Sequence, residues 1–117
     1  ASLNIITAVT PSAISVNAVS LAGSLIVPWR GEVQPWDCCE IGALTQEHLE
    51  LVASMSPEVV LLGTGPRLRF ASPSLLRPLM SRRIGMETMD TAAACRTFNI
   101  VAGEGRSVVA LLMLPQP

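Results

Sequence analysis

The chain contains no lysine and no tyrosine, and both absences limit what it can be. All eight basic residues are arginine and the net charge is −1, so the positive excess typical of non-specific nucleic-acid binding is missing. Aromatic residues make up only 3% of the chain, so its core has to be built from aliphatic side chains and methionine. The first 29 residues carry no charge, but polar residues and prolines interrupt them before about 20 apolar residues accumulate. We therefore expect no nucleic-acid partner and no membrane span.

The chain also lacks the residue patterns of common catalytic and metal sites. His48 is the single histidine, and the adjacent Cys38 and Cys39 lack the two-residue gap of a zinc knuckle. These neighbours would form a strained disulfide, and Cys95 would still remain unpaired, so a reducing compartment fits best. We expect no metal, no cofactor and no catalytic residue, which favours a protein without enzymatic activity, and a cytoplasmic location.

What the chain does contain is an excess of apolar residues on a small body. Half of its 117 residues are hydrophobic and 15% are charged, which is the opposite of a disordered chain. This length fits one domain, and we expect a single α/β domain over residues 1–117. So large an apolar fraction predicts that some apolar side chains face a partner.

The hydrophobic pattern changes period along the chain. Short alternating segments come first, with a hairpin signal at Asn17-Ala18, and helical spacing begins at Thr45. Strands are expected over residues 4–9, 14–16, 19–21, 24–27, 59–62, 84–89 and 108–114. Helices are expected after Thr45, from Ser72-Pro73, and from a Thr91 cap to near Gly103, with an irregular connection over residues 29–42. The order predicts a three-layer α/β fold: a central mixed, mostly parallel sheet, helices packed on it, and an N-terminal β-hairpin region.

The charges divide between the two halves of the chain. Residues up to 58 hold six acidic residues and Arg30, a net −5, whereas the remainder holds seven arginines and three acidic residues, a net +4. Arginine is suited to bidentate pairing with carboxylate or phosphate. The simplest interpretation is that the halves pair with each other across the folded surface.

Two segments that follow predicted strands form the candidate ligand site. The first is the loop over residues 63–69, and the second is residues 90–99 at the start of the last helix. Ligands of open α/β sheets bind outside the carboxyl ends of the strands, and a helix N-terminus favours negative charge. The residues predicted to bind a small anionic ligand are Gly63, Thr64, Gly65, Arg67, Asp90, Thr91, Cys95, Arg96 and Asn99, with Arg67 or Arg96 facing the anion.

Each part of this site also has a purely structural interpretation. The Gly63-Thr64-Gly65 run is a tight exit from a strand, and it matches neither a phosphate loop nor a dinucleotide fingerprint. Thr91 caps a helix, and Asp90 accepts from loop amides or pairs with an arginine. Cys95 is interpreted as a small packing residue, because no base is predicted beside it.

Two motifs carry a family resemblance: Val60-Leu61-Leu62-Gly63-Thr64-Gly65, and Met89-Asp90-Thr91-Ala92-Ala93-Ala94-Cys95-Arg96-Thr97-Phe98-Asn99. With them the chain resembles the family of the mitochondrial respiratory complex I assembly factor 3 and its small bacterial and archaeal relatives of unknown function. The resemblance extends through Gly23-Ser24-Leu25 to Glu104-Gly105-Arg106 and the final strand. It implies a three-layer α/β fold, no established enzymatic activity, and a eukaryotic member that binds other proteins during assembly of the respiratory complex.

The chain departs from this family pattern near its start. Residues 8–11 replace an aromatic residue and a glycine that are frequent there, and Ala18 replaces a glycine after the hairpin asparagine. Three interpretations follow: a non-catalytic protein-interaction or assembly module, which we favour; a binder of small anions, or an enzyme, using the two segments; and a self-associating structural domain.

Overall fold

A five-stranded sheet of almost wholly apolar strands forms the centre of the computed structural model, which describes residues 2–115. Its order is β5-β4-β8-β6-β7, with bounds Leu25–Pro28 (β4), Gln34–Pro35 (β5), Val59–Gly63 (β6), Gly85–Met89 (β7) and Val108–Leu112 (β8). Strand β6 pairs in parallel with both β7 and β8, whereas β4 pairs antiparallel with β8 and β5. Because only β4 runs against the others, the sheet is mixed and mostly parallel, as predicted.

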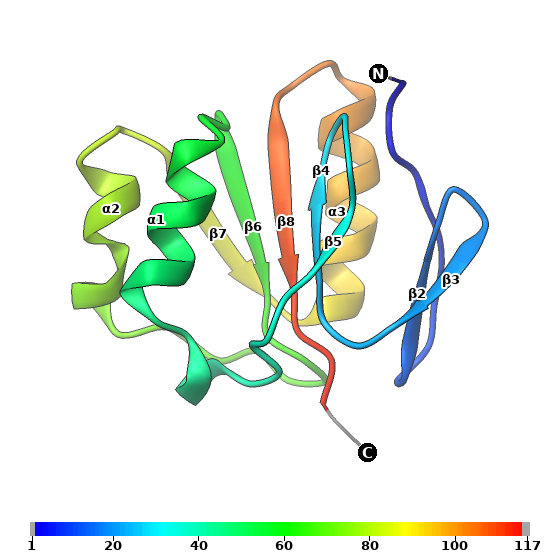
Figure 1. Ribbon diagram of the computed structural model, residues 1–117, viewed down its shortest axis with the longest axis horizontal. Coiled ribbons are helices and arrows are strands. Elements are labelled where there is room, and N and C mark those ends of the chain that lie inside the picture. The colour runs from blue at the N-terminus through cyan, green and yellow to red at the C-terminus, as the bar shows by residue number, and fades with distance from the viewer. Residues whose placement is uncertain (1, 116–117) are drawn as a thin grey trace.

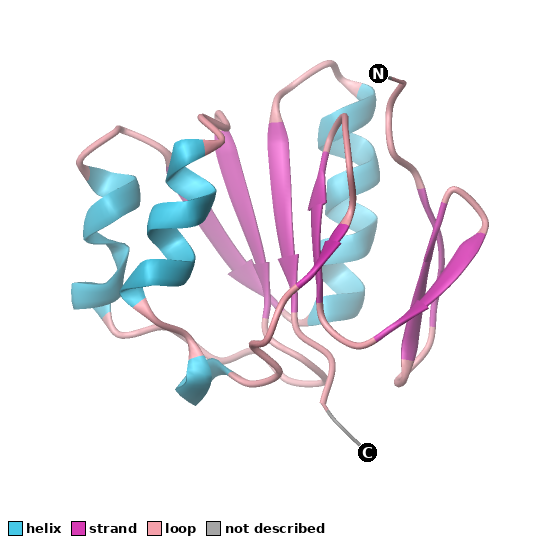
Figure 2. Ribbon diagram, in the orientation of Figure 1, coloured by secondary structure: helices cyan, strands magenta, loops and turns pink. Residues whose placement is uncertain are grey.

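Two further layers cover the sheet (Figures 1 and 2). On one face lie α1 (Gln46–Ser54), η2 (Pro73–Leu76) and α2 (Arg77–Met80). On the other face lie α3 (Thr91–Gly103) and a second, antiparallel sheet of β1 (Ile6–Val9), β2 (Ala13–Val16) and β3 (Val19–Ala22). The predicted three-layer α/β architecture and N-terminal hairpin region are therefore confirmed.

The central strands are buried on both faces, and their residues alternate between two cores. Val59 and Leu61 of β6 point into the core shared with α3 and the three-stranded sheet. Val60 and Leu62 point into the core under α1 and α2. This explains why β6 reads as a continuous apolar run rather than an alternating one.

The N-terminal hairpin turns at Asn17 and Ala18, as predicted. Both residues have positive φ angles, 53° and 68°, which is the conformation of the two-residue hairpin turn that follows the twist of the strands. Alanine tolerates this conformation poorly. Hydrogen bonds compensate: the Ala18 amide donates to the Thr7 hydroxyl at 3.1 Å, and the Asn17 side chain accepts from the Ile5 amide at 2.9 Å.

Several predicted boundaries differ from those of the structure: the first strand begins at Ile6 rather than at residue 4, and the strand expected over residues 84–89 begins at Gly85. The helix expected from Ser72-Pro73 is a 3-10 turn followed by the four-residue α2, because Pro78 has no N–H to continue an α-helix begun earlier. The irregular connection over residues 29–42 contains β5 and η1 (Ile41–Ala43). The last strand ends at Leu112 rather than at residue 114.

Candidate functional site

The two predicted ligand segments meet at the carboxyl end of the central sheet. Gly63 ends β6 directly beside Met89, which ends β7. Beyond these strand ends the main chains remain joined, because the Thr64 amide donates to the Met89 carbonyl and the Thr91 amide donates to the Gly65 carbonyl, both at 2.9 Å. The topological reasoning from sequence therefore brought the correct segments together.

Gly63 is required by the close packing of α3 on β6. A Cβ at this position would lie 3.0 Å from both the Ala94 Cβ and the Thr91 Cα. The small side chain of Ala94 permits this approach from the helix side, and the absent side chain of Gly63 permits it from the strand side. The Gly-Thr-Gly and triple-alanine motifs thus include the two sides of one packing contact.

Thr64 holds the following loop in one conformation. Its buried hydroxyl donates to the Arg67 carbonyl at 2.6 Å and accepts from the Arg69 amide at 3.0 Å. A single side chain therefore fixes both ends of the segment that carries the two arginines. The loop is preorganised, and its side chains are free to point outward.

The start of α3 is already satisfied by the protein's own groups. Asp90, rather than Thr91, is the N-cap: its carboxylate accepts from the Ala93 amide at 2.8 Å. The Thr91 hydroxyl donates to the Met113 carbonyl at 2.7 Å and accepts from the Gly65 amide at 2.8 Å, so it fastens the helix to β8 and β6. The predicted Thr91 cap was wrong because this hydroxyl is buried in the sheet edge, and the Asp90 charge already occupies the position an anion would favour.

The remaining three predicted residues point away from this edge. The Cys95 thiol is buried in the core, and burial raises its pKa to about 12 despite the nearby Arg96 guanidinium. Arg96 is exposed on the outer side of α3. Asn99 bonds to strand β1: its side-chain oxygen accepts from the Ile6 amide at 2.9 Å, and its side-chain nitrogen donates to the Ile6 carbonyl at 2.8 Å.

Two neighbouring cavities open at the carboxyl end of the sheet. The larger, of about 650 Å³, is lined by Cys39, Glu40, Ile41, Gly42, Thr64, Pro66, Arg67, Arg69 and Pro115. The smaller, of about 350 Å³, is lined by Val9, Thr10, Pro11, Gly65, Pro66, Asp90, Thr91, Ala92, Leu114 and Pro115. Pro66 and Pro115 border both. The predicted ligand residues therefore divide: Thr64 and Arg67 line the larger cavity, and Gly65, Asp90 and Thr91 line the smaller.

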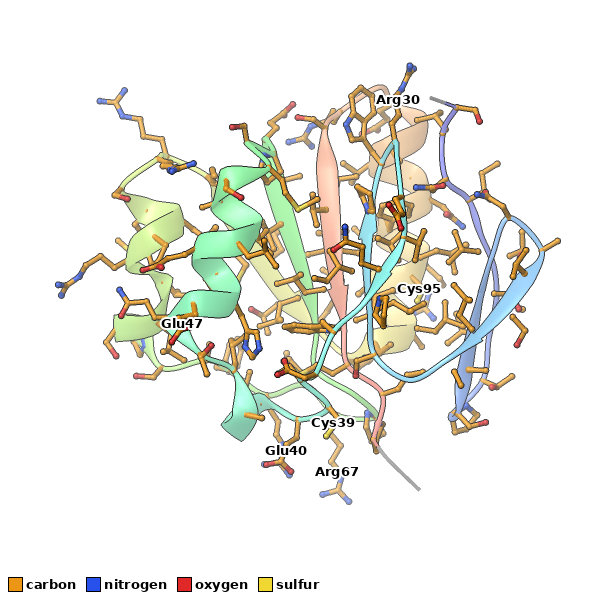
Figure 3. All side chains as sticks on the ribbon, in the orientation of Figure 1. Arg30, Cys39, Glu40, Glu47, Arg67 and Cys95 are labelled. Carbon is orange, nitrogen blue, oxygen red and sulfur yellow. The ribbon has the colours of Figure 1, made fainter. Side chains whose placement is uncertain are left out.

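The loop beside the larger cavity exposes two apolar side chains that sequence reasoning did not single out. Phe70 is 75% exposed and Leu68 is 51% exposed, in alternation with Arg67 and Arg69. The same cavity is also lined by Cys39 and Glu40, and Figure 3 shows both beside Arg67 while Cys95 lies well away on α3. Arginines that alternate with apolar residues in a loop were the available signal for this surface.

The single histidine, His48, caps the N-terminus of α1 together with Thr45. The His48 Nδ1 accepts from the Thr45 amide at 3.0 Å, and its amide donates to the Thr45 hydroxyl, so the two residues form a capping box. Nε2 therefore carries the proton and donates to Asp37 at 2.7 Å. This hydrogen bond and the positive potential of His48 lower the pKa of Asp37.

The predicted pairing of the two charge-divided halves is limited to one ion pair within residues 2–115. The Arg106 guanidinium contacts Glu58 at 2.7 Å. Arg82 instead donates to the Ala53 carbonyl, and Arg30 stacks over the Trp29 ring. Neither arginine of the loop over residues 66–70 forms an ion pair within residues 2–115, and Glu40 lines the same cavity.

The described residues offer neither a metal-binding cluster nor a membrane-spanning helix. Within residues 2–115, no group of three or more His, Cys, Asp or Glu side chains is placed to hold a metal ion. Over the same residues, every helix is too short or too polar to cross a membrane.

Burial raises the pKa of the Cys38 thiol to about 11, and its Sγ donates to the Glu40 carbonyl.

Comparison with known proteins places the fold among proteins of unknown function. A family profile described as "Protein of unknown function (DUF498/DUF598)" matches residues 6–113. The NADH dehydrogenase [ubiquinone] 1 alpha subcomplex assembly factor 3 of Bos taurus is 36% identical over 71% of this chain, which spans only 46% of that protein. This confirms the resemblance seen in the two sequence motifs.

Solved structures agree closely with the fold. A crystal structure from Bordetella parapertussis superposes with a TM-score of 0.91 and 38% identity, covering 99% of this chain and 98% of that one. An outer membrane protein of Bartonella henselae superposes with a TM-score of 0.87 and 33% identity, covering 98% of each chain.

Proposed function

We propose that this chain, which belongs to the DUF498/DUF598 family of proteins of unknown function, is a non-catalytic protein-binding module. The observation that carries the proposal is the loop at the carboxyl end of the sheet, which Thr64 ties together by hydrogen bonds and which exposes Leu68 and Phe70 in alternation with Arg67 and Arg69. The relatives named as assembly factors support it, since assembly factors act on other proteins.

The residues that catalysis would most readily use already have structural roles. His48 is committed through both ring nitrogens, to the Thr45 amide and to Asp37. Cys95 is buried, and its raised pKa keeps the thiol protonated and a poor nucleophile. The polar groups at the start of α3 bond to the protein itself. These commitments support binding rather than chemistry.

The loop has the composition of a binding hot spot. Exposed aromatic and arginine side chains contribute most of the binding free energy in many interfaces, particularly when they surround a pocket. Here the loop adjoins the larger cavity, and Thr64 holds it without help from a partner, so little conformational entropy is lost on binding. We expect the partner to insert apolar side chains beside Phe70 and to present carboxylates to Arg67 and Arg69.

The test is quantitative capture from a lysate of the source cell, followed by reconstitution with the purified partner. Phe70→Ser and the double charge reversal Arg67→Glu/Arg69→Glu should each lower capture of the same protein at least tenfold. Ile100→Ser is the matched control, because Ile100 is an exposed apolar residue on α3. Equal capture by all variants contradicts the proposal. A melting temperature within about 2 °C of the unaltered protein shows that each variant is folded, as expected for exposed positions.

A small anionic ligand is the second candidate, and the arginines of the larger cavity favour it. Arg67 and Arg69 line this cavity with Thr64, whereas Arg96 lines neither cavity. Calorimetric titration with inorganic phosphate and with malonate tests it. Binding that Arg67→Ala abolishes and Arg96→Ala leaves unchanged supports a ligand site, and no binding at millimolar ligand contradicts it.

The location of the chain is part of the proposal. Cys38, Cys39 and Cys95 are all free thiols, which fits a reducing compartment such as the cytoplasm. The similarity to an outer membrane protein makes this worth measuring. Fractionation of source cells with an antibody to the chain should place it in the cytoplasmic fraction, and recovery with the membranes contradicts that location.

A further inference from the structure

Strand β3 is a short edge strand that lacks the charged residues, prolines and bulges that commonly prevent an edge from pairing with another chain. It pairs with β2 alone and forms one margin of the three-stranded sheet (Figure 1). Natural edges are protected by charged residues, prolines or bulges. Strand β3 reads Val-Ser-Leu-Ala, its pairing with β2 is regular, and the first 29 residues carry no charge.

The register of the hairpin shows which main-chain groups of β3 face outward. Val16 and Val19 flank the two-residue turn and therefore form a hydrogen-bonded pair, and bonded and non-bonded pairs then alternate along the hairpin. Leu21 is bonded to Ile14, whereas Ser20 and Ala22 stand opposite residues to which they are not bonded. The N–H and C=O groups of Ser20 and Ala22 therefore point away from β2, and the structure records no partner for them within residues 2–115.

The side chains of β3 also leave the core incomplete at this margin. Val19 and Leu21 lie on the face that points inward, because their opposite residues Val16 and Ile14 are buried. Leu21 packs against the core but is only half-buried, and Val19 is 58% exposed. One more strand beside β3 would cover both side chains.

We propose that this additional strand is β3 of a second copy of the chain, paired antiparallel about a two-fold axis. With Leu21 opposite Leu21 of the second copy, Ser20 faces Ala22 of that copy, and the reverse. Each of these two pairs exchanges both of its main-chain hydrogen bonds, while the two Leu21 side chains meet in the close, non-bonded position between them. Every outward group of Ser20 and Ala22 is satisfied, and the two inward faces become one apolar row.

The second copy fits this edge because the register is self-complementary and opposes no like charges. A charged partner would gain nothing here, since no residue of the three-stranded sheet carries a charge. The strand is only four residues long, so the interface is small and the dimer dissociates on dilution. This surface is separate from the loop over residues 66–70.

Sedimentation velocity on the full chain, from about 1 µM to about 1 mM, is the test. We expect the mass to rise from that of one chain, 12.4 kDa, toward twice that value. Ser20→Pro removes an outward N–H that β2 does not use, and Ala22→Lys sets two positive charges against each other across the axis. Both variants should remain monomeric throughout. Ala8→Lys, with the same added charge on β1 at the other margin of the sheet, should associate as the unaltered chain does.

Amide NMR shifts measured over the same concentrations provide a residue-level readout. Concentration-dependent shifts and slowed hydrogen exchange should appear at Ser20 and Ala22. A chain that stays monomeric at the highest concentration overturns the proposal, as does association that survives both β3 variants. A dimer abolished by Phe70→Ser instead would assign self-association to the loop and also overturn it. If the dimer forms as described, the proposed partner at the loop remains a separate question, because Ser20→Pro should not affect its capture.

Discussion

Residues 90–99 start at the end of the central sheet where residues 66–70 lie, yet the two segments use their side chains in opposite ways. In the first segment, the side chains of Asp90, Thr91 and Asn99 form hydrogen bonds with main-chain groups of the protein itself. In the second, Arg67, Leu68, Arg69 and Phe70 project from a backbone that Thr64 holds in place. The segment with the more distinctive sequence is the structural one, and the plainer loop offers the free side chains.

The two phenylalanines of the chain provide the sharpest test of this contrast. Phe98 on α3 is completely buried, whereas Phe70 is mostly exposed. Phe98→Ala should lower the free energy of unfolding by about 3–5 kcal/mol, because it removes a large core side chain and leaves a cavity. Phe70→Ala should change it by less than about 0.5 kcal/mol. Urea unfolding of both variants measures this, and similar losses would remove the contrast.

Asn99→Ala should have the next largest effect. It leaves the Ile6 amide and carbonyl without their partners, and the loss should be about 2–3 kcal/mol for two groups that water reaches only in part. Hydrogen exchange should quicken throughout β1 to β3 while β6 and β8 stay protected. Arg96→Ala, an exposed control on the same helix, should leave both measurements unchanged.

Gly63→Ala tests the packing contact between strand and helix. The added Cβ would lie 3.0 Å from the Thr91 Cα, which is main chain and cannot turn aside, so we expect a loss of about 1–3 kcal/mol. Gly103→Ala, at the end of α3 with no atom within 4 Å of its new Cβ, should be neutral or stabilising. Equal Tm values for the two variants would show that α3 moves away without cost.

Alkaline pH should also lower the stability of the protein, and thiols are the side chains that can cause this loss. With no lysine or tyrosine, cysteines are the side chains that titrate between about pH 9 and 12. The pKa of Cys38 rises from 9.0 to about 11 and that of Cys95 to about 12 on folding, so the unfolded chain loses these protons first. The contribution of these two thiols to the free energy of unfolding is therefore fully present below pH 9, and it is lost as the pH rises toward 11 to 12.

The double variant Cys38→Ala/Cys95→Ala assigns this alkaline loss to the buried thiols, because it should flatten the dependence of the unfolding free energy on pH. A loss that persists unchanged in the double variant would contradict the assignment.

Much of the fold was predictable because local pattern and tertiary position agree. The continuous apolar run over residues 59–62 predicts a strand that is covered on both faces of the sheet, as observed. The Asn17-Ala18 pair between two alternating segments predicts the tight hairpin turn that the structure has. Rules based on neighbouring residues failed where a residue distant in sequence determines the structure. The sequence around Thr91 predicts a helix cap, but its hydroxyl instead bonds to the Met113 carbonyl and the Gly65 amide. Pro78, in contrast, was a local signal that the sequence interpretation passed over.

The candidate site was predictable in position but not in composition. Strand ends joined by a crossover had to meet, so the segments that hold Gly63, Gly65 and Asp90 lie side by side, while their role as ligand residues stays a prediction. Cys39 and Glu40 reach the cavity from a connection whose path no periodicity describes. The exposure of Phe70 depends on how Thr64 bonds across its loop, and a hydroxyl's choice of partner is not visible in sequence.

The hydrogen bonds between Asn99 and Ile6 have a consequence for the folding of the chain during its synthesis. Its partners are separated by 93 positions, so strand β1 leaves the ribosome long before the helix that secures it exists. At a synthesis rate of roughly 5–20 residues per second, roughly 5–20 s pass between the synthesis of the uncharged strand β1 and that of Asn99, which bonds to it. During that interval an apolar nascent sheet is open to chaperones and to neighbouring chains on the same message.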